Sequence, residues 1–287
     1  MTTITLVGAG GKMGCRLTDN FIKSPQYRVS YLEVAPKGIA HLTERGVPVS
    51  KMEDTIPGSD VVILALPDTI IGKLSGTILP LMRPGALVLT LDPAAPIDGV
   101  IYDRDDLGYV IAHPCHPSVF NWEPTEEAFR DFYGGISARQ SIVVALMKGT
   151  EDHYRLGQKV AQDMYAPIAR THRITLEQMA ILEPAMVETL AQTCMEVIKE
   201  GYDRILELGV PKEAARDFVL GHLRIQIAVL FGEVNGTFSD AAYRISKRAK
   251  PLLFKEGWQR FFDKDNIREQ VRDITGAPEP AGDLTRS

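Results

Sequence analysis

The opening of the chain constrains the fold more than any other segment. A short β-branched run, Ile4–Val7, leads directly into a glycine-rich turn, and the amphipathic segment Arg16–Ile22 follows it. The turn consists of Gly8, Ala9, Gly10, Gly11, Lys12, Met13 and Gly14. Glycines at such a turn let the chain reverse tightly and let the following helix pack close to the strand. The order of strand, turn and helix predicts the first half of a βαβ unit.

An acidic residue, Glu33, stands where the second predicted strand ends. A carboxylate at this point can accept hydrogen bonds from both hydroxyls of an adenosine ribose, and its charge repels a 2′-phosphate. The turn departs by one residue from the Gly-x-Gly-x-x-Gly spacing, with Gly14 or Gly11 in the third position. We predict that all seven residues of the turn, together with Glu33, bind NAD rather than NADP. The alternative is an ordinary strand-to-helix turn beside a solvated acid.

The same alternation of strands and helices continues to residue 150. The predicted strands are Ile4–Val7, Arg28–Glu33, Val61–Leu66, Leu87–Leu91, Tyr109–Ala112 and Ser141–Met147. Several are apolar on both faces, as in a sheet that helices cover on both sides. We therefore predict an α/β fold whose N-terminal domain, residues 1–150, is a Rossmann-type doubly wound sheet. Pro67 and Asp68 follow the third strand at the carboxyl edge, where ligands bind in such sheets, and are added to the predicted cofactor site.

Residues 151–275 have apolar residues at three- and four-residue spacing, which predicts an all-helical second domain. Thr175 and Gln178 form a capping-box pattern at the start of a helix, and Pro184 should kink that helix. Gly209, Val210 and Pro211 predict a break before a long helix, Lys212–Phe231. This helix is apolar on more than one face, so a homodimer that buries part of it is a reasonable hypothesis. Residues 276–287 are expected to form a flexible tail.

Composition excludes several classes of function. The 287 residues include 32 basic and 37 acidic side chains, for a net charge of −5, which gives no attraction to nucleic acid or to anionic membranes. No apolar run approaches the roughly 20 residues that cross a bilayer, and the first strand leaves no room for a signal peptide. The three cysteines are widely spaced. We expect a cytoplasmic protein with reduced thiols and a small-molecule substrate.

An unusual segment, His113–Ser118, directly follows the fifth predicted strand. Its sequence is His-Pro-Cys-His-Pro-Ser, and the two prolines restrict the backbone around His113 and His116. Such a restriction suits an imidazole that binds a metal or transfers a proton. Both roles stay open, and a hydrogen-bonded loop histidine is an equal alternative for His113. Cys115 is interpreted as a packing residue.

Glu183 precedes Pro184 within an apolar stretch. A carboxylate at a helix kink can bind a divalent ion or accept a proton. We predict His116 and Glu183 as the catalytic pair, with Glu188 as a competing acid and His222 as a candidate substrate contact.

With these residues, the chain resembles the dehydrogenases that join an NAD-binding Rossmann domain to a helical domain like that of 6-phosphogluconate dehydrogenase. The segments Gly8–Gly14, His113–Ser118 and Thr175–Glu188 are most similar to oxidoisomerases that act on branched sugar acids in bacterial carbohydrate catabolism. The resemblance implies oxidation of a 2-hydroxyl by NAD, followed by movement of a hydroxymethyl group from the neighbouring tertiary carbinol to the new ketone.

Such a rearrangement needs charge stabilisation on two neighbouring oxygens, which a chelated divalent metal supplies. We predict that His116 and Glu183 help to hold this metal, and that it is zinc because imidazole is a ligand. Without a metal, His116 would be the general base. Two other functions remain open: a simple hydroxy-acid or prephenate-like dehydrogenase without rearrangement, and a catalytically silent NAD-sensing protein.

Overall fold

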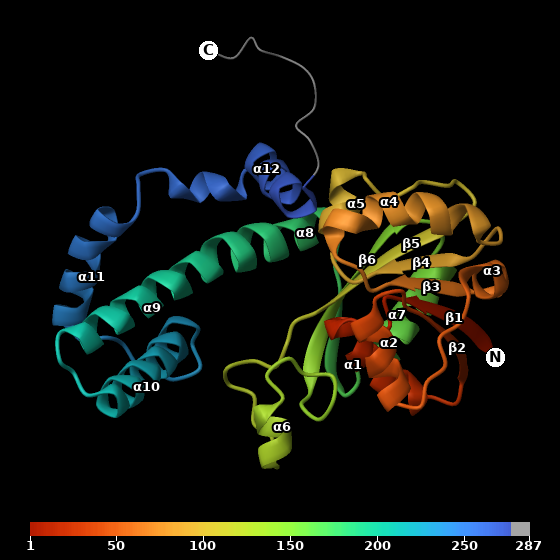
Figure 1. Cartoon of the computed structure of the whole chain (residues 1–287). Helices are drawn as coiled ribbons and strands as arrows, with labels where there is room; N and C mark the ends of the chain where they lie inside the picture. Colours follow the sequence, from red (N-terminus) through yellow and green to blue (C-terminus); the bar gives the residue numbers. More distant parts are fainter. Residues whose placement is uncertain (277–287) are drawn as a thin grey trace, which may run out of the picture. The chain divides into compact units, whose positions relative to one another are not determined.

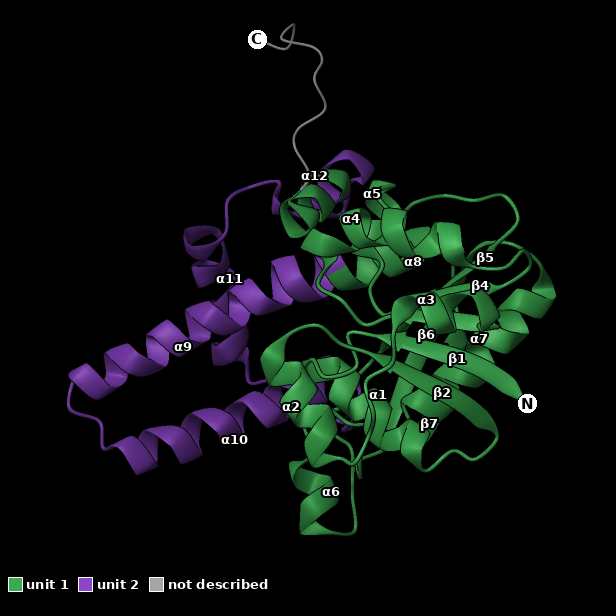
Figure 2. Ribbon diagram, turned by 45° about the vertical axis from the view of Figure 1, so that its right-hand side comes forward, with its two compact units in different colours: residues 1–183, 268–287 green, residues 184–267 purple. Residues whose placement is uncertain are grey.

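The computed structural model describes residues 1–276, so the predicted tail lies outside the described residues except for Gly276. The chain divides into two compact units (Figure 2). Of the described residues, unit 1 contains 1–183 and 268–276, and unit 2 contains 184–267.

Unit 1 is built on one seven-stranded sheet (Figure 1) with the strand order β2-β1-β3-β4-β5-β6-β7. The strands are β1 (Thr2–Val7), β2 (Tyr27–Leu32), β3 (Val61–Leu64), β4 (Leu87–Thr90), β5 (Gly108–Pro114), β6 (Gln140–Lys148) and β7 (Ile168–Arg173). All neighbouring strands pair in parallel except β5 and β6, which pair antiparallel. The chain runs from β1 to one side and then returns past it to β3, so the topological switch point lies between β1 and β3. The predicted α/β fold with a doubly wound sheet is confirmed.

Helices cover both faces of this sheet (Figure 1). Alternate residues of β3 belong to opposite cores: Val61 and Ile63 pack with helices α1 and α7, whereas Val62 and Leu64 pack with α4. Because each face of the sheet contributes to a core, the central strands need apolar residues on both faces, as their sequences show. The helices of unit 1 are α1 (Lys12–Ile22), α2 (Pro36–Glu44), α3 (Met52–Thr55), α4 (Asp68–Ile78), α5 (Ala94–Asp98), α6 (Glu126–Arg130), α7 (Glu151–Met164) and α8 (Leu176–Ala180).

The first compact unit extends further than the predicted boundary at residue 150. Helix α7 buries Tyr154, Val160 and Met164 in the core that it shares with the sheet, and β7 pairs with β6. The prediction that no strand follows residue 150 is therefore wrong for β7. Its sequence, Ile-Ala-Arg-Thr-His-Arg, leaves Arg170 and His172 exposed at the sheet edge and so lacks the apolar pattern of the other strands.

The capping box at Thr175 is present. The Thr175 hydroxyl accepts the Gln178 amide at 3.2 Å, and the Gln178 side chain accepts the Thr175 amide at 2.9 Å. After α8 the chain forms a π-helical segment, Ile181–Ala191, which contains Pro184, the residue at which a kink was predicted. A proline removes one amide donor, and the wider π-helical hydrogen-bonding pattern accommodates that loss.

Unit 2 is helical. After the π-helical segment come α9 (Gln192–Glu207), α10 (Lys212–Leu230) and α11 (Asp240–Leu253), and the predicted break at residues 209–211 separates the first two. A short 3-10 turn (Trp258–Phe262) follows, and α12 (Lys264–Thr275) leads back into unit 1. Large apolar side chains are exposed on this unit, among them Phe218, Leu230, Phe231, Ile245 and Leu252. Among residues 1–276, none of the helices has the length and apolar character that a membrane crossing requires.

Candidate active site

The glycine turn is packed so closely that its shape depends on the absence of side chains. Gly8 has a φ of +78°, and a Cβ atom there would lie 2.3 Å from the carbonyl oxygen of Ala65, at the end of β3. A Cβ atom on Gly14 would lie 2.0 Å from the carbonyl oxygen of Gly8. The turn therefore sits at the switch point, with the backbone of α1 pressed against the end of β1. This is the arrangement in which a diphosphate can reach backbone amides.

Glu33 lies beside this turn, as predicted. One carboxylate oxygen accepts the Gly10 amide at 3.0 Å, and the other accepts the amides of Val34 and Ala35 at 2.8 and 2.9 Å. A cavity of about 420 Å³ adjoins it, lined mainly by apolar side chains and by Gly8 and Glu33. A largely apolar cavity whose lining includes the carboxylates of Glu33 and Glu53 suits an adenine with its ribose.

Pro67 and Asp68 begin helix α4. The Asp68 carboxylate accepts the Ala95 amide at 3.2 Å. Burial raises the pKa of Asp68 to about 6, the negative charge of Asp92 adds to this rise, and His113 opposes it. Asp68 thus belongs to the electrostatic surroundings of Asp92 and His113.

His113, Asp92 and Glu183 form a group of metal-ligating side chains. The Nδ1 atom of His113 lies 2.8 Å from the carbonyl oxygen of Leu91, and its Nε2 atom lies 3.3 Å from a Glu183 oxygen. An Asp92 oxygen lies 3.7 Å from His113 Nδ1. One ligand atom from each residue falls within 4.8 Å of the others, and all three residues are half-buried.

The hydrogen bonds of this group define what it can bind. A carbonyl oxygen only accepts, so His113 Nδ1 donates to Leu91, and in the neutral form of the ring Nε2 presents a lone pair. That lone pair faces the Glu183 carboxylate, which is also an acceptor. Burial raises the pKa of Glu183, the charge of His113 opposes this rise, and Asp92 adds to it. Two acceptors in contact require a proton or a cation between them.

His116 is not among the three residues of this group, and its predicted pairing with Glu183 as metal ligands stays a prediction. His113 still lies in β5, whereas His116 follows the strand with a φ of +57°. Its Nδ1 atom donates to the carbonyl oxygen of Tyr133 at 2.9 Å. In the neutral form of the ring this leaves Nε2 as an acceptor, and in the protonated form the ring lies close enough for its charge to act on Glu183.

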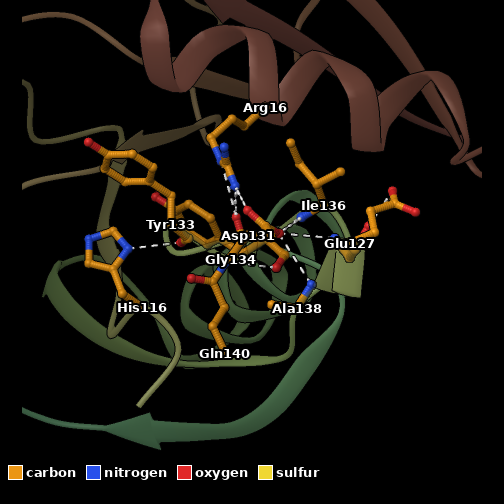
Figure 3. Close-up of polar contacts among 12 residues, drawn as sticks. Arg16, His116, Glu127, Asp131, Tyr133, Gly134, Ile136, Ala138 and Gln140 are labelled. Carbon is orange, nitrogen blue, oxygen red and sulfur yellow. Dashed lines mark hydrogen bonds and ion pairs between the residues drawn. The ribbon is translucent and has the colours of Figure 1, made fainter. Parts of the chain in front are cut away.

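The β5–β6 loop, residues 115–139, carries His116 and Tyr133 and is anchored on helix α1. Figure 3 shows Arg16 reaching from α1 to Asp131 and to the carbonyl oxygen of Gly134. The other Asp131 oxygen accepts three backbone amides of the same loop, those of Ile136, Ser137 and Ala138. Asn20, also on α1, donates to the carbonyl oxygen of Gly135 at 2.8 Å.

Sequence reasoning missed Asp92 and Tyr133. A signal for Asp92 was available, because it lies two residues after the end of β4, and His113 lies at the same end of the neighbouring parallel strand β5. Tyr133 had no such signal, since only the folded loop brings it to His116. Two other candidates lie in unit 2: Glu188 is exposed, and His222 donates to the carbonyl oxygen of Phe218 at 2.7 Å and stacks on its ring.

Comparison with known proteins places the chain in a family. Residues 121–275 match the model for the phosphogluconate dehydrogenase (decarboxylating) C-terminal domain. D-apionate oxidoisomerase of Cupriavidus necator is 50% identical over 273 residues, which cover 95% of this chain and 99% of the relative. D-apionate oxidoisomerase of Rhizobium rhizogenes is 42% identical, covering 96% of this chain and 100% of the relative. The chain belongs to the D-apionate oxidoisomerase family.

A crystal structure related to this family extends the comparison. It is described as a semialdehyde dehydrogenase NAD-binding protein from Cupriavidus necator in complex with calcium and NAD. It is 50% identical, has a TM-score of 0.93, and the match covers 96% of this chain and 100% of that one. Membership in the D-apionate oxidoisomerase family confirms the predicted resemblance and the predicted enzyme class, an oxidoreductase.

Proposed function

We propose that this enzyme is an NAD-dependent D-apionate oxidoisomerase. It oxidises the 2-hydroxyl of D-apionate, after which a hydroxymethyl group moves to the new ketone and gives 3-oxo-isoapionate. One observation carries the proposal: relatives of this name match the chain almost from end to end. The geometry supports it, because one compact unit holds both a dinucleotide turn and a cluster of acid–base groups.

The glycine turn and Glu33 would hold NAD, which supplies the hydride acceptor. Helix α1 begins at Lys12 without a side-chain cap, so the amides of its first turn can donate to a diphosphate. Glu33 lies where a ribose would be bound, and its negative charge disfavours the 2′-phosphate of NADP. The NAD in the crystal structure of the Cupriavidus necator protein supports this assignment.

His116 is the proposed general base. Its Nδ1–H group is held by the Tyr133 carbonyl, so the lone pair of Nε2 is free to accept the proton of the 2-hydroxyl during hydride transfer. The ring is also exposed, as substrate access requires.

Asp92, His113 and Glu183 would hold a divalent metal, in place of the predicted pair of His116 and Glu183. A histidine with two carboxylates is a donor set that zinc accepts, and two facing acceptors fit a cation between them. The metal would stabilise negative charge on two neighbouring substrate oxygens during the rearrangement. The Cupriavidus necator crystal structure contains calcium, so calcium is tested beside zinc.

We also propose that the enzyme is a homodimer. The exposed apolar side chains of α10 and α11, such as Phe218, Leu230 and Ile245, are more than a helical unit of this size keeps in water without a partner surface. Light scattering at micromolar concentration would give the mass of two chains.

The activity is tested with NAD and a panel of D-apionate, unbranched 2-hydroxy acids and prephenate, while NADH formation is followed by absorbance. We expect turnover with D-apionate and a rearranged carbon skeleton in the product by carbon-13 NMR. An oxidised but unrearranged product would identify a simple dehydrogenase. Binding of NAD without turnover of any acid would identify an NAD-sensing protein.

Two variants separate the metal from the base. Glu183→Gln should lose bound metal in elemental analysis and retain its affinity for NADH. His116→Ala should keep the metal but lower kcat by about 10²- to 10⁴-fold, the usual contribution of a general base. Metal loss in His116→Ala, with full metal content in Glu183→Gln, would contradict the assignment.

A further inference from the structure

Two side chains with hydrogen-bond donors, Lys12 and Tyr133, meet beside the proposed base His116. Lys12 Nζ donates to the Tyr133 hydroxyl at 2.7 Å and also lies 4.2 Å from the centre of the Tyr133 ring. The His116 ring packs edge-on against Tyr133, with 5.9 Å between ring centres. Tyr133 is 46% exposed, so a ligand can reach this cluster from solvent.

The cluster has an excess of donors and of positive charge. None of the described carboxylates forms an ion pair with Lys12, whose ammonium group has two N–H groups beyond the one directed at Tyr133. Because the Tyr133 hydroxyl accepts from Lys12, its own O–H remains available to donate. The hydrogen bond and the charge of Lys12 lower the pKa of Tyr133, which makes that O–H a stronger donor.

Arg16 is the other cation nearby, but its guanidinium already forms hydrogen bonds within the protein. It lies 5.5 Å from the Tyr133 ring centre and donates to Asp131 and Gly134. Its contacts hold the β5–β6 loop in place, as Figure 3 shows, and so fix Tyr133 next to Lys12. The cluster is therefore anchored by its surroundings while Lys12 and Tyr133 keep free donors.

The backbone conformation of His116 also indicates that the cluster is a ligand site. His116 is the non-glycine residue with positive φ among residues 1–276, a conformation that costs a non-glycine residue about 1 to 2 kcal/mol. The Tyr133 carbonyl holds it there through Nδ1. Residues kept in such a conformation concentrate at ligand sites.

We propose that Lys12 and Tyr133 bind the carboxylate of the sugar-acid substrate. This rests on the proposed function, since it assumes an acid whose 2-hydroxyl is the reacting group. The carboxylate carbon is bonded to the carbon that bears this hydroxyl. A carboxylate held by Lys12 and Tyr133 thus places the hydroxyl beside His116, which packs on the same tyrosine ring.

The proposal assigns one role to the backbone of Lys12 and another to its side chain. Its backbone belongs to the glycine turn and so to the predicted cofactor site, whereas its side chain is directed at the β5–β6 loop. A lysine that instead binds the cofactor diphosphate would be needed for NAD affinity, and the test below separates the two.

The test compares Lys12→Met and Tyr133→Phe with the parent enzyme. For each, kcat and KM are measured for D-apionate and for NAD, and the Kd of NADH is measured by fluorescence. Removal of a charged hydrogen bond in Lys12→Met should raise the KM for D-apionate by about 10- to 100-fold, and Tyr133→Phe by about 3- to 10-fold. The Kd of NADH should stay within about twofold of the parent value, since neither group is assigned to the cofactor.

Three controls make the result specific. Lys12→Arg should restore part of the affinity, because it restores the charge. Lys23→Met makes the same change at the far end of helix α1, where the side chain is exposed, and should leave all constants unchanged. The amide of D-apionate should bind more weakly than the acid to the parent enzyme, but equally to Lys12→Met, because the discrimination depends on this cation.

Calorimetric titration of D-apionate into the NADH complex measures binding without turnover. If the parent protein does not oxidise D-apionate, the proposed function fails, while the titration still tests the subsite. A Lys12→Met variant with weakened NADH binding and an unchanged KM for D-apionate would assign the lysine to the diphosphate and overturn the proposal. Unchanged constants in both variants, or no binding of D-apionate to the NADH complex, would overturn it as well.

Discussion

The proposed cofactor end of unit 1, around Gly8–Gly14, and its proposed substrate end, around His113 and His116, make their contacts with different kinds of atoms. At Gly8–Gly14 the contacts are made by backbone atoms, and a single Cβ on Gly14 would overlap the chain. Around His113 and His116 the contacts are made by side chains, several of them exposed, that come from four separate segments. At the first end binding and folding depend on the same atoms. At the second end a reacting group can be removed while the surrounding fold remains.

Helix α1 connects the two ends. Its first turn packs against the end of β1 as part of the glycine turn, and further along the helix Arg16 and Asn20 hold the β5–β6 loop. A shift of α1 at the glycine turn would therefore also move Tyr133 and His116. One end depends on backbone contacts and the other on side-chain contacts, but helix α1 positions both. The following predictions test this difference and this shared dependence on α1.

The largest effect is expected for Gly14→Ala. The added Cβ would lie 2.0 Å from the Gly8 carbonyl oxygen, so the start of α1 must move away from β1. We expect the affinity for NADH to fall by about 100-fold and the free energy of unfolding to fall by about 3 kcal/mol, as for a severe overpacking change. Fluorescence titration and urea denaturation measure the two quantities.

Gly76→Ala is the matched control for this change. Gly76 lies within helix α4, and an added Cβ meets no atom within 4 Å. Alanine is the better helix former by about 1 kcal/mol, so the variant should be slightly more stable and bind NADH normally. A Gly14→Ala protein that binds NADH as the parent does would contradict the backbone-based account of the cofactor end.

The sequence predicted these two ends unequally, for physical reasons. The glycine turn and Glu33 act through local backbone geometry, which residues close together in the sequence specify. Their role could therefore be predicted from the sequence pattern. The metal-ligating group joins Asp92, His113 and Glu183, and only strand order and the start of a helix bring them together. The sequence predicts His116 beside Glu183, but residue type alone does not say which ring is directed at this carboxylate, and the structure places the His113 ring there. Strand β7 was missed because its exposed edge residues are polar.

An intermediate effect is expected for Asp131→Asn, which weakens the anchor of the β5–β6 loop. Burial acts to raise the pKa of Asp131, but hydrogen bonds from three loop amides and from Arg16 outweigh it and leave the pKa below its usual value. The ionised carboxylate is therefore the form that stabilises the fold. At neutral pH the variant should lose about 2 kcal/mol of unfolding free energy, the scale of hydrogen bonds to a charged group.

The pH dependence follows from the direction of this shift. A group whose pKa is lowered by folding stabilises the protein fully above its unfolded pKa, and this contribution disappears as the pH falls through the lower, folded value. The stability difference between Asp131→Asn and the parent should thus be constant above about pH 5 and shrink below about pH 4. Asp152→Asn, at an exposed ion pair, serves as control and should change stability little. A difference that grows with acidification would contradict the assignment.

The smallest effect is expected for Thr175→Ala, which tests how far the substrate end depends on a helix start. Thr175 caps helix α8, and the buried Met179 of that helix packs against Ile111 of β5 and so sets where the following Glu183 lies. Loss of the cap should lower the free energy of unfolding by about 1 kcal/mol and kcat by about threefold. Thr150→Ala removes the equivalent capping box of α7, a helix that carries no proposed catalytic residue. Equal stability losses with a lower kcat only in Thr175→Ala would show that the cap positions Glu183, whereas equal kcat values would mean that the packing of Met179 holds the carboxylate without it.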